Sequence, residues 1–215
     1  MPKLTQEEER LRQKKMWEIE KNLKEKGYTY IAGVDEAGRG PLAGPVYAAA
    51  VILPCGAELT GINDSKKLTP KKREELFRKI TEIAVSYSIF SVDERVIDEI
   101  NILNATHKAM NGAVDGLSQK PDYVIIDGNS IKGMELPHET IVKGDAKSIS
   151  IAAASILAKV ARDRYIDEMG KVYPEYGFEN HKGYGTKAHT DAILKYGVCP
   201  IHRRTFLKKL LGEDK

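Results

Sequence analysis

Four carboxylates occupy positions from which they could do chemistry. Asp35 and Glu36 are adjacent at the end of one apolar run, and Asp127 ends a second apolar run. Asp145 lies between a short strand-like segment and a long helical one. A carboxylate at the end of a buried strand must be paired, hydrogen-bonded or bound to a metal. Adjacent carboxylates repel each other, and this repulsion favours a divalent cation between them.

Four carboxylates suit hard cations such as Mg²⁺ or Mn²⁺, which take oxygen ligands. Two such ions, about 3.5–4 Å apart, stabilise the attacking and leaving oxygens of an in-line phosphoryl displacement. Neighbours in a regular strand face opposite ways, so we expect the strand to end or bulge at Asp35 and Glu36. Taken singly, an Asp before a glycine is more often a turn residue, and Asp145 could simply cap a helix.

The elements that position these acids follow from the apolar pattern. Strands are predicted over 29–35, 46–53, 86–92, 122–127 and 139–143. Helices are predicted over 70–84, over 93–117 in two pieces, along a long segment that includes 149–160, and over 187–196 and 203–211. The first two strands should form an antiparallel hairpin, and Gly33 predicts a close approach by another element. Strands followed by alternating strands and helices predict an α/β fold with a mixed sheet.

A charged helix is predicted over 4–26, ending at Gly27. It is expected to lie across the domain as an accessory helix, or else to act as an arm that contacts a partner or substrate. The side chains expected near one face, or beside it, are Leu4, Leu11, Met16, Trp17, Ile19 and Leu23.

Composition sets the broad class. The 215 residues suit one domain, possibly with a small appendage, and 41% hydrophobic with 30% charged residues is ordinary for a globular protein. The net charge of +3 does not by itself indicate nucleic acid. No run approaches the roughly 20 apolar residues of a membrane span, and the acidic start is not a signal peptide. Cys55 and Cys199 form no disulfide framework and fit a reducing cytoplasm.

The charge is unevenly distributed. From His181 onward there are eight Lys and Arg residues and three acids, which gives this tail a net charge of +5. A solvated face and a nucleic-acid contact explain such a tail equally well.

The run from Asp35 to Pro45, DEAGRGPLAGP, resembles the signature of type 2 ribonuclease H. The resemblance covers about residues 29–200, in matching order and spacing. It continues through DSKKL at 64–68, IDG at 126–128, KGDA at 143–146, AAASILAKV at 152–160 and HKGYGT at 181–186. Type 3 relatives share the core but differ after the Asp-Glu pair and carry an extra N-terminal domain. The intact Gly38-Arg39-Gly40 therefore favours the bacterial-like type 2 family, ribonuclease HII.

The resemblance implies a ribonuclease H-like fold, with a mixed central sheet flanked by helices. An N-terminal helical extension would span 1–27, and a catalytic domain would span 28–215, including a C-terminal helical region at about 175–215. It implies an endoribonuclease that hydrolyses the RNA strand of RNA–DNA hybrids and cuts 5′ of single ribonucleotides in duplex DNA. The products would carry 3′-hydroxyl and 5′-phosphate ends.

The resemblance also implies residue roles. The four carboxylates would hold two Mg²⁺ or Mn²⁺ ions, and Gly38-Arg39-Gly40 would contact the ribose 2′-hydroxyl, the group that distinguishes RNA from DNA. Tyr184 would stack at the RNA–DNA junction, although without the family match a half-buried loop residue is the simpler interpretation. Phosphate contacts are expected from lysines, each of which taken alone is more often a solvated charge: Lys66, Lys67, Lys143, Lys147, Lys182 and Lys187.

Two other protein classes match short parts of the sequence. Gly38 to Ala43 formally fits the G-x-G-x-x-A of a dinucleotide-binding oxidoreductase, but that fingerprint needs a helix, which Pro41 and Pro45 deny. A zinc-stabilised nucleic-acid-binding module could use Cys199 with the nearby histidines, but the spacing matches no common finger and a second Cys is missing. The tail has no Gln followed by paired aromatics, so no sliding-clamp partner is indicated, and we expect a monomer.

Overall fold

A five-stranded mixed sheet forms the centre of the computed structural model, which describes residues 5–213. The strand order is β3-β2-β1-β4-β5. The strands are β1 (Ile31–Ala37), β2 (Val46–Ile52), β3 (Ser86–Val92), β4 (Tyr123–Asp127) and β5 (His138–Ile141). The expected α/β class with a mixed sheet is therefore confirmed.

The pairing of β1 determines where the sheet opens. β1 runs antiparallel to β2, which confirms the expected hairpin, and parallel to β4. Its pairing with β2 continues to Ala37↔Tyr47, whereas its pairing with β4 stops at Val34↔Ile126. The expectation that the strand ends or bulges at Asp35 and Glu36 was wrong, because the ladder with β2 stays regular through both residues. Beyond Val34, however, the side of β1 toward β4 is open.

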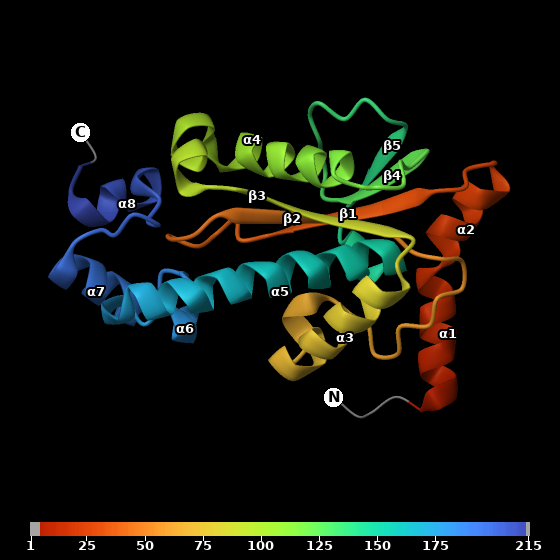
Figure 1. Ribbon diagram of the computed structural model, residues 1–215, viewed down its shortest axis with the longest axis horizontal. Helices are drawn as coiled ribbons and strands as arrows, with labels where there is room; N and C mark the ends of the chain where they lie inside the picture. Colours follow the sequence, from red (N-terminus) through yellow and green to blue (C-terminus); the bar gives the residue numbers. More distant parts are fainter. Residues whose placement is uncertain (1–4, 214–215) are drawn as a thin grey trace.

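Helices cover both faces of this sheet (Figure 1). α4 lies on one face, and α5 with α3 lies on the other. No helix within residues 5–213 has the length and apolarity needed to cross a membrane. The helices are α1 (Gln6–Met16), α2 (Glu18–Glu25), α3 (Pro70–Ile83), α4 (Glu94–Asp115), α5 (Ile149–Val172), α6 (Phe178–His181), α7 (Lys187–Tyr196) and α8 (Arg204–Leu211).

Local sequence explains how the helices start and break. The Thr69 side chain accepts a hydrogen bond from the backbone of Lys72, and Pro70 occupies the first turn of α3. Asp93 caps α4 in the same way. The two pieces predicted for α4 correspond to Asn101, whose φ of 66° interrupts the helix. α5 begins at the Ser148 cap, so the alternative of Asp145 as the helix cap was wrong.

α5 packs directly on β1. A Cβ at Gly33 would lie 2.2 Å from the carbonyl carbon of Ser150, so only glycine allows this approach, as predicted. The consecutive small residues Ala152, Ala153 and Ala154 are fully buried in the same core. This close packing places the first turns of α5 beside the end of β1 that carries the acids.

The N-terminal segment forms two helices instead of the single one predicted. The break falls at Trp17, whose indole nitrogen donates to the carbonyl oxygen of Ala57. Met16 and Leu23 are buried as expected, but Leu11 is 57% exposed, and Leu4 lies outside the described residues. α1 and α2 lie at one end of the sheet, across from α7 and α8 (Figure 1).

A buried carboxylate joins α2 to α5. Glu20 is 2% exposed, and its Oε1 accepts hydrogen bonds from Ser148 Oγ (2.6 Å) and from the backbone nitrogen of Ser150 (3.0 Å). Burial raises the pKa of Glu20, and its hydrogen bonds to Ser148 and Ser150 act in the opposite direction. The N-terminal helices therefore support the start of α5, directly after the segment that contains Asp145.

Candidate active site

One cavity of 530 Å³ collects the residues that the sequence pointed to. It lies where β1 and β4 end, on the open side of β1. All four candidate acids line it, together with the Gly38–Gly40 turn and Tyr184. The full lining is Asp35, Glu36, Ala37, Gly38, Arg39, Gly40, Ser65, Lys66, Arg73, Asp127, Asp145, Ser155, Lys159 and Tyr184.

The ends of two parallel strands bring the acids together. Gly33 faces α5 and Val34 packs in the cluster that contains α4, so alternation along β1 directs Asp35 toward α5 and Glu36 toward α4. Both side chains reach the cavity because β4 no longer pairs with β1 there. Asp35 Oδ1 accepts a hydrogen bond from the backbone nitrogen of Glu36 at 2.7 Å. Asp127 Oδ1 accepts one from the nitrogen of Gly144 at 2.5 Å, which ties the end of β4 to the turn carrying Asp145.

The acids disfavour one another's charge. Burial, followed by the charges of Glu36 and Asp127, holds the pKa of Asp35 well above its usual value. Burial also raises the pKa of Glu36, although Arg39 lies 3.4 Å from its Oε1 and acts in the opposite direction. The pKa of Asp145 is raised by burial and then by the charges of Asp64 and Asp127. The charge of Asp64, a residue that sequence reasoning did not single out, therefore also acts on the acids of the cavity.

This donor set fits a hard divalent cation, since every candidate ligand is a carboxylate oxygen and a cation would relieve the repulsion. Within the described residues, no three His, Cys, Asp or Glu side chains already converge on a single ion position. The acids surround an open cavity and do not form a closed cage. Mg²⁺ in particular is commonly held by few carboxylates and keeps several waters.

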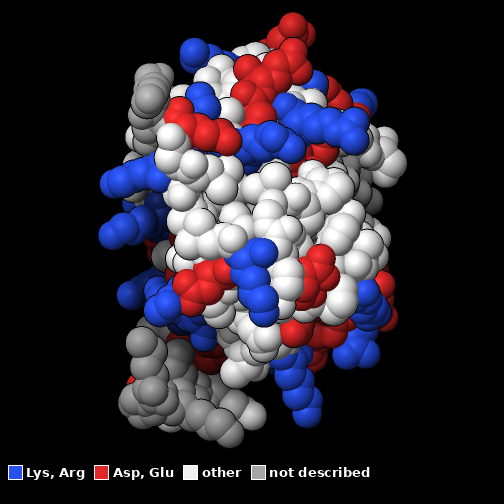
Figure 2. Space-filling model, turned by 90° about the vertical axis from the view of Figure 1, so that its left-hand side faces the viewer, with Lys and Arg blue, Asp and Glu red and all other residues white. Residues whose placement is uncertain are grey.

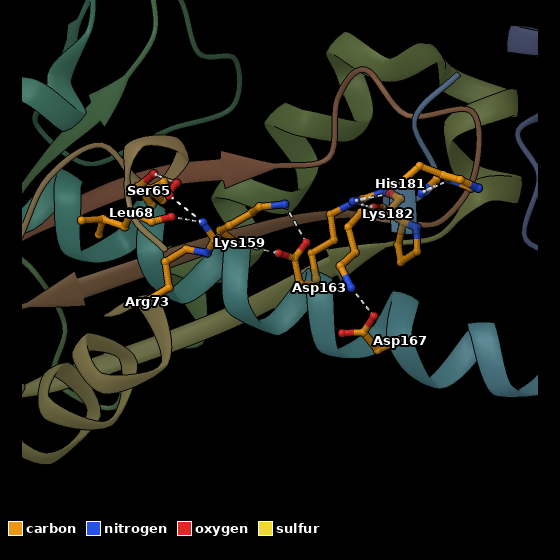
Figure 3. A network of polar contacts seen from close by, with 12 residues as sticks. Ser65, Leu68, Arg73, Lys159, Asp163, Asp167, His181 and Lys182 are labelled. Atoms are coloured by element: carbon orange, nitrogen blue, oxygen red, sulfur yellow. Dashed lines mark hydrogen bonds and ion pairs between the residues drawn. The ribbon is translucent and has the colours of Figure 1, made fainter. Parts of the chain in front are cut away.

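Cationic side chains border the acids. Lys159 and Arg73 line the cavity, and Asp163 of α5 lies between them, 2.6 Å from Lys159 Nζ and 3.7 Å from Arg73 (Figure 3). Arg73 also donates to the carbonyl oxygens of Ser65 and Leu68, which fixes the loop next to the cavity (Figure 3). Sequence reasoning gave Lys159 and Arg73 no role. Lys159 nevertheless lies in the segment 152–160, and Ser65 and Leu68 lie in the segment 64–68, both of which resemble the family.

Of the predicted lysine contacts, only Lys66 lines the cavity. Lys182 forms an ion pair with Asp167 of α5 (Figure 3), and Lys187 pairs with Asp191. Three further predicted lysines are not among the lining residues: Lys67, Lys143 and Lys147.

The Gly38–Gly40 turn lies against Tyr184. A Cβ at Gly40 would lie 3.7 Å from Tyr184 Cε1, an ordinary contact distance. Tyr184 itself is 43% exposed, so its ring borders the cavity and is partly open to solvent. Gly38 has φ of +98°, a conformation that side chains rarely adopt.

The charged tail does not form one basic face. Figure 2 shows the end of the molecule that carries α7 and α8, where Lys and Arg mix with Asp and Glu around a broad uncharged area. Lys195 lies over the ring of Tyr196, and Arg203 is fully buried. The net charge of the tail therefore overstates the basic surface that it presents.

The two rival classes do not fit the geometry. No helix opens after Gly38, and the chain continues through a loop into β2, so the dinucleotide fingerprint is absent. His181, His189 and His202 gather near Cys199, but they are buried and hydrogen-bonded, and His189 Nε2 lies 3.0 Å from His202 Nε2. The ring nitrogens of these three histidines already form hydrogen bonds with other groups of the chain, so the three histidines and Cys199 form no zinc site.

Solved structures define the class. The fold matches ribonuclease H2 from Pyrococcus horikoshii OT3 with a TM-score of 0.72 and 30% identity, covering 86% of this chain and 98% of that one. It matches ribonuclease HII from Archaeoglobus fulgidus, solved in complex with PCNA, with a TM-score of 0.68, 28% identity and coverage of 81% and 94%. Bst-RNase HIII in complex with Mn²⁺ has the same fold, with a TM-score of 0.65, 21% identity and coverage of 86% and 70%. The chain thus has the fold of the ribonuclease H nucleases.

Sequence comparison specifies the family. The model of the family described as "Ribonuclease HII" matches residues 32–209. The chain is 56% identical over 195 residues to ribonuclease HII of Caldicellulosiruptor saccharolyticus, covering 91% of this chain and 95% of that protein. The chain belongs to the ribonuclease HII family. It is a metal-dependent endoribonuclease for RNA–DNA hybrids and embedded ribonucleotides, and the expected type 2 assignment is confirmed.

Proposed function

We propose that Asp35, Glu36, Asp127 and Asp145 hold two divalent cations, Mg²⁺ or Mn²⁺, for phosphodiester hydrolysis. The observation that carries this proposal is the convergence of four mutually repelling carboxylates on one cavity, beside the Gly38–Gly40 turn. A solved relative of the same fold was crystallised with Mn²⁺, which supports divalent metal use. When bound, such ions activate the attacking water and stabilise the charge on the leaving 3′-oxygen.

The protein's own residues would orient the substrate. We propose that Gly38-Arg39-Gly40 contacts the ribose 2′-hydroxyl, which is the chemical difference between RNA and DNA. Arg39 is half-exposed and only loosely paired with Glu36, so its guanidinium can hold a neighbouring phosphate. The partly open ring of Tyr184, next to Gly40, can stack on a sugar or base at the RNA–DNA junction.

The 2′-hydroxyl would serve as a recognition handle and not as the nucleophile. The products would then carry 3′-hydroxyl and 5′-phosphate ends, with the cut on the 5′ side of the ribonucleotide. Histidines, which metal-free ribonucleases use, do not line this cavity.

Phosphate contacts would come from the cations around the cavity. Lys66 lines it, and Arg73 and Lys159 add positive charge that sequence reasoning missed. The remaining predicted lysines would act farther along the duplex and contribute nonspecific affinity: Lys67, Lys143, Lys147, Lys182 and Lys187.

We also propose that the protein acts as a monomer in the cytoplasm. The four acids, the Gly38–Gly40 turn and Tyr184 already line one cavity within a single chain, so the proposed site needs no residue from a second copy. Both cysteines are free, with Cys55 exposed and Cys199 buried, which suits a reducing compartment.

The proposal is tested with an end-labelled DNA duplex that contains one ribonucleotide. The protein and its Asp35→Asn variant are incubated with it in Mg²⁺, in Mn²⁺ and in EDTA. A single metal-dependent cut 5′ of the ribonucleotide, lost in the variant, is the expected result. An unchanged duplex with folded protein in both metals contradicts the single-ribonucleotide specificity, and a fully active variant contradicts the role of Asp35.

A further inference from the structure

Two arginines lie in the protein interior behind the Gly38–Gly40 turn. Arg203 precedes α8 and is 0% exposed, and Arg162 on α5 is 1% exposed. A buried charge is costly unless hydrogen bonds replace its water. Both guanidinium groups meet this need by donating to main-chain carbonyl oxygens.

Arg203 contacts the turn and the loop that follows it. Its Nη2 donates to the carbonyl oxygens of Gly38 and Gly44, each at 2.6 Å. Its Nη1 donates to those of Arg39 (3.0 Å) and Pro41 (2.9 Å), and its Nε donates to Gly44 at 2.8 Å. These five bonds use every N–H donor of the guanidinium group. The backbone nitrogen of Arg203 adds a bond to the carbonyl oxygen of Leu42, at 2.9 Å.

Arg162 joins the same loop to the segment that carries Tyr184. Its Nε and Nη2 donate to the carbonyl oxygens of Pro45 (3.2 Å) and Ala43 (3.0 Å). Its Nη1 donates to the carbonyl oxygen of Lys182 at 3.1 Å, two residues before the tyrosine. The two loops also meet directly, because the nitrogen of Leu42 donates to the carbonyl oxygen of Gly183 at 2.8 Å.

We propose that Arg203 and Arg162 are positioning residues for ribonucleotide recognition, which fix the Gly38–Gly40 turn relative to Tyr184. The inference rests on the proposed contact of this turn with the 2′-hydroxyl. With its carbonyl oxygens held from behind, the turn keeps one conformation whether or not a duplex is bound. The ring of Tyr184 is held at a constant distance from Gly40. The enzyme therefore meets the 2′-hydroxyl with a preformed site and loses little freedom on binding.

Lysine cannot replace arginine in this role. The rigid fork of Arg203 serves four carbonyl groups at once, whereas an ammonium group has three donors and no fixed plane. Arg203→Lys keeps the positive charge and much of the side-chain volume, so it tests only the loss of the guanidinium hydrogen bonds to the four carbonyl groups.

The test is the ratio of two affinities, measured in Mg²⁺ with the Asp35→Asn background to prevent cleavage. One duplex carries a single ribonucleotide, and the other has the same sequence in DNA alone. Arg203→Lys and Arg162→Lys should each reduce the preference for the ribonucleotide roughly 2- to 10-fold, because a displaced turn loses the hydrogen bonds to a single hydroxyl group. Affinity for the all-DNA duplex, which depends on phosphate contacts, should not change.

Arg204→Lys is the matched control, because Arg204 is the exposed neighbour of Arg203 on the same segment, and it should leave the ratio unchanged. Circular dichroism establishes that each variant is folded, and if Arg203→Lys does not fold, Arg162→Lys decides. The inference is overturned if the folded lysine variants keep the wild-type ratio, or if both affinities fall in parallel. A background protein that shows no preference for the ribonucleotide overturns the proposed role of the turn itself, and the inference with it.

Discussion

His202 Nε2 and His189 Nε2 lie 3.0 Å apart in the interior below the Tyr184 loop. The backbone nitrogen of Cys199 donates to His202 Nδ1 at 2.8 Å, so the proton of a neutral His202 must sit on Nε2 and point to His189. His189 then carries its own proton on Nδ1, which donates to the carbonyl oxygen of Tyr184 at 2.9 Å. Two neutral histidines thus connect the Cys199 loop to the backbone of the proposed stacking residue.

The hydrogen-bonded pair His189 and His202 predicts that the folded protein loses stability in acid. Burial lowers the pKa of both His189 and His202 from 6.5 to about 4. Between pH 4 and pH 6.5 the unfolded chain binds more protons at these two histidines than the folded chain does. Their contribution to stability is therefore fully present above about pH 6.5 and is lost as the pH falls toward 4. The carboxylates with raised pKa values act in the opposite direction, so a variant must isolate the histidines. From pH 7 to pH 5 the wild type should lose about 1–3 kcal/mol more stability than His202→Gln in urea unfolding.

The control for this experiment is His138→Gln, which changes an exposed histidine. Its pH profile should follow the wild type. A His202→Gln profile that is parallel to the wild type would contradict a neutral pair in the folded state.

The repulsion among the acids predicts opposite effects of Asp35→Asn on stability and activity. Asp35 is 5% exposed and its pKa is raised by burial and by neighbouring carboxylates, so removing its charge should increase the free energy of unfolding of the metal-free protein. Cleavage should fall on the order of 10³-fold or more, because several kcal/mol of transition-state stabilisation are lost. Thermal melts in EDTA and in excess Mg²⁺ measure the first effect. Mg²⁺ should stabilise the wild type more than the variant, and a metal-free variant less stable than wild type would contradict this interpretation.

Gly38 and Gly40 should respond differently to alanine. The backbone at Gly38 has φ of +98°, and a Cβ there would lie 2.1 Å from Arg162 Nε. Gly38→Ala should therefore destabilise the fold by about 1–3 kcal/mol. A Cβ at Gly40 would meet only Tyr184, at 3.7 Å, so Gly40→Ala should fold normally and yet cleave the one-ribonucleotide duplex more slowly. Urea unfolding and initial cleavage rates separate the two effects. Equal stability of both variants would show that the turn tolerates a side chain at either position.

Glu20 should be the residue that attaches the N-terminal helices to α5. Glu20→Ala leaves Ser148 Oγ and the nitrogen of Ser150 without their acceptor, at a cost of about 1–3 kcal/mol. Glu20→Gln keeps an acceptor and should cost less. The exposed Glu25→Ala, which removes only a 3.9 Å surface pair with Lys21, should change stability by a few tenths of a kcal/mol. Similar unfolding midpoints for Glu20→Ala and Glu25→Ala would contradict the role of Glu20.

The strands and most helices could be predicted because their signals are local. Apolar runs ending in Asp or Glu placed the acids at one sheet edge, and Thr69 with Pro70 marked the start of α3. Strand bounds differ from the prediction by at most two residues. The break at Trp17 was missed because the indole bond to Ala57, 40 residues away, leaves no periodic signal.

Arg203 shows what the sequence could not reveal. It was counted in a basic tail whose charges suggested solvent or nucleic acid, yet it is buried against carbonyl groups about 160 residues earlier in the chain. Main-chain carbonyls have no sequence signature, so a charge satisfied by them looks like a surface charge. The sequence also did not reveal how Asp35 and Glu36 share a cavity. They do so because β4 stops pairing with β1 at Val34, and the end of a backbone ladder has no sequence signature either.

We propose that this cavity hydrolyses the phosphodiester with a metal-activated water and uses the 2′-hydroxyl only for recognition. The direct test maps both new ends after cleavage of a DNA duplex with one ribonucleotide in Mg²⁺, by mass spectrometry of the fragments. We predict a 3′-hydroxyl on the upstream DNA and a 5′-phosphate on the fragment that begins with the ribonucleotide. A cut on the 3′ side of the ribonucleotide that leaves a 2′,3′-cyclic phosphate would contradict it, because that product requires attack by the 2′-hydroxyl.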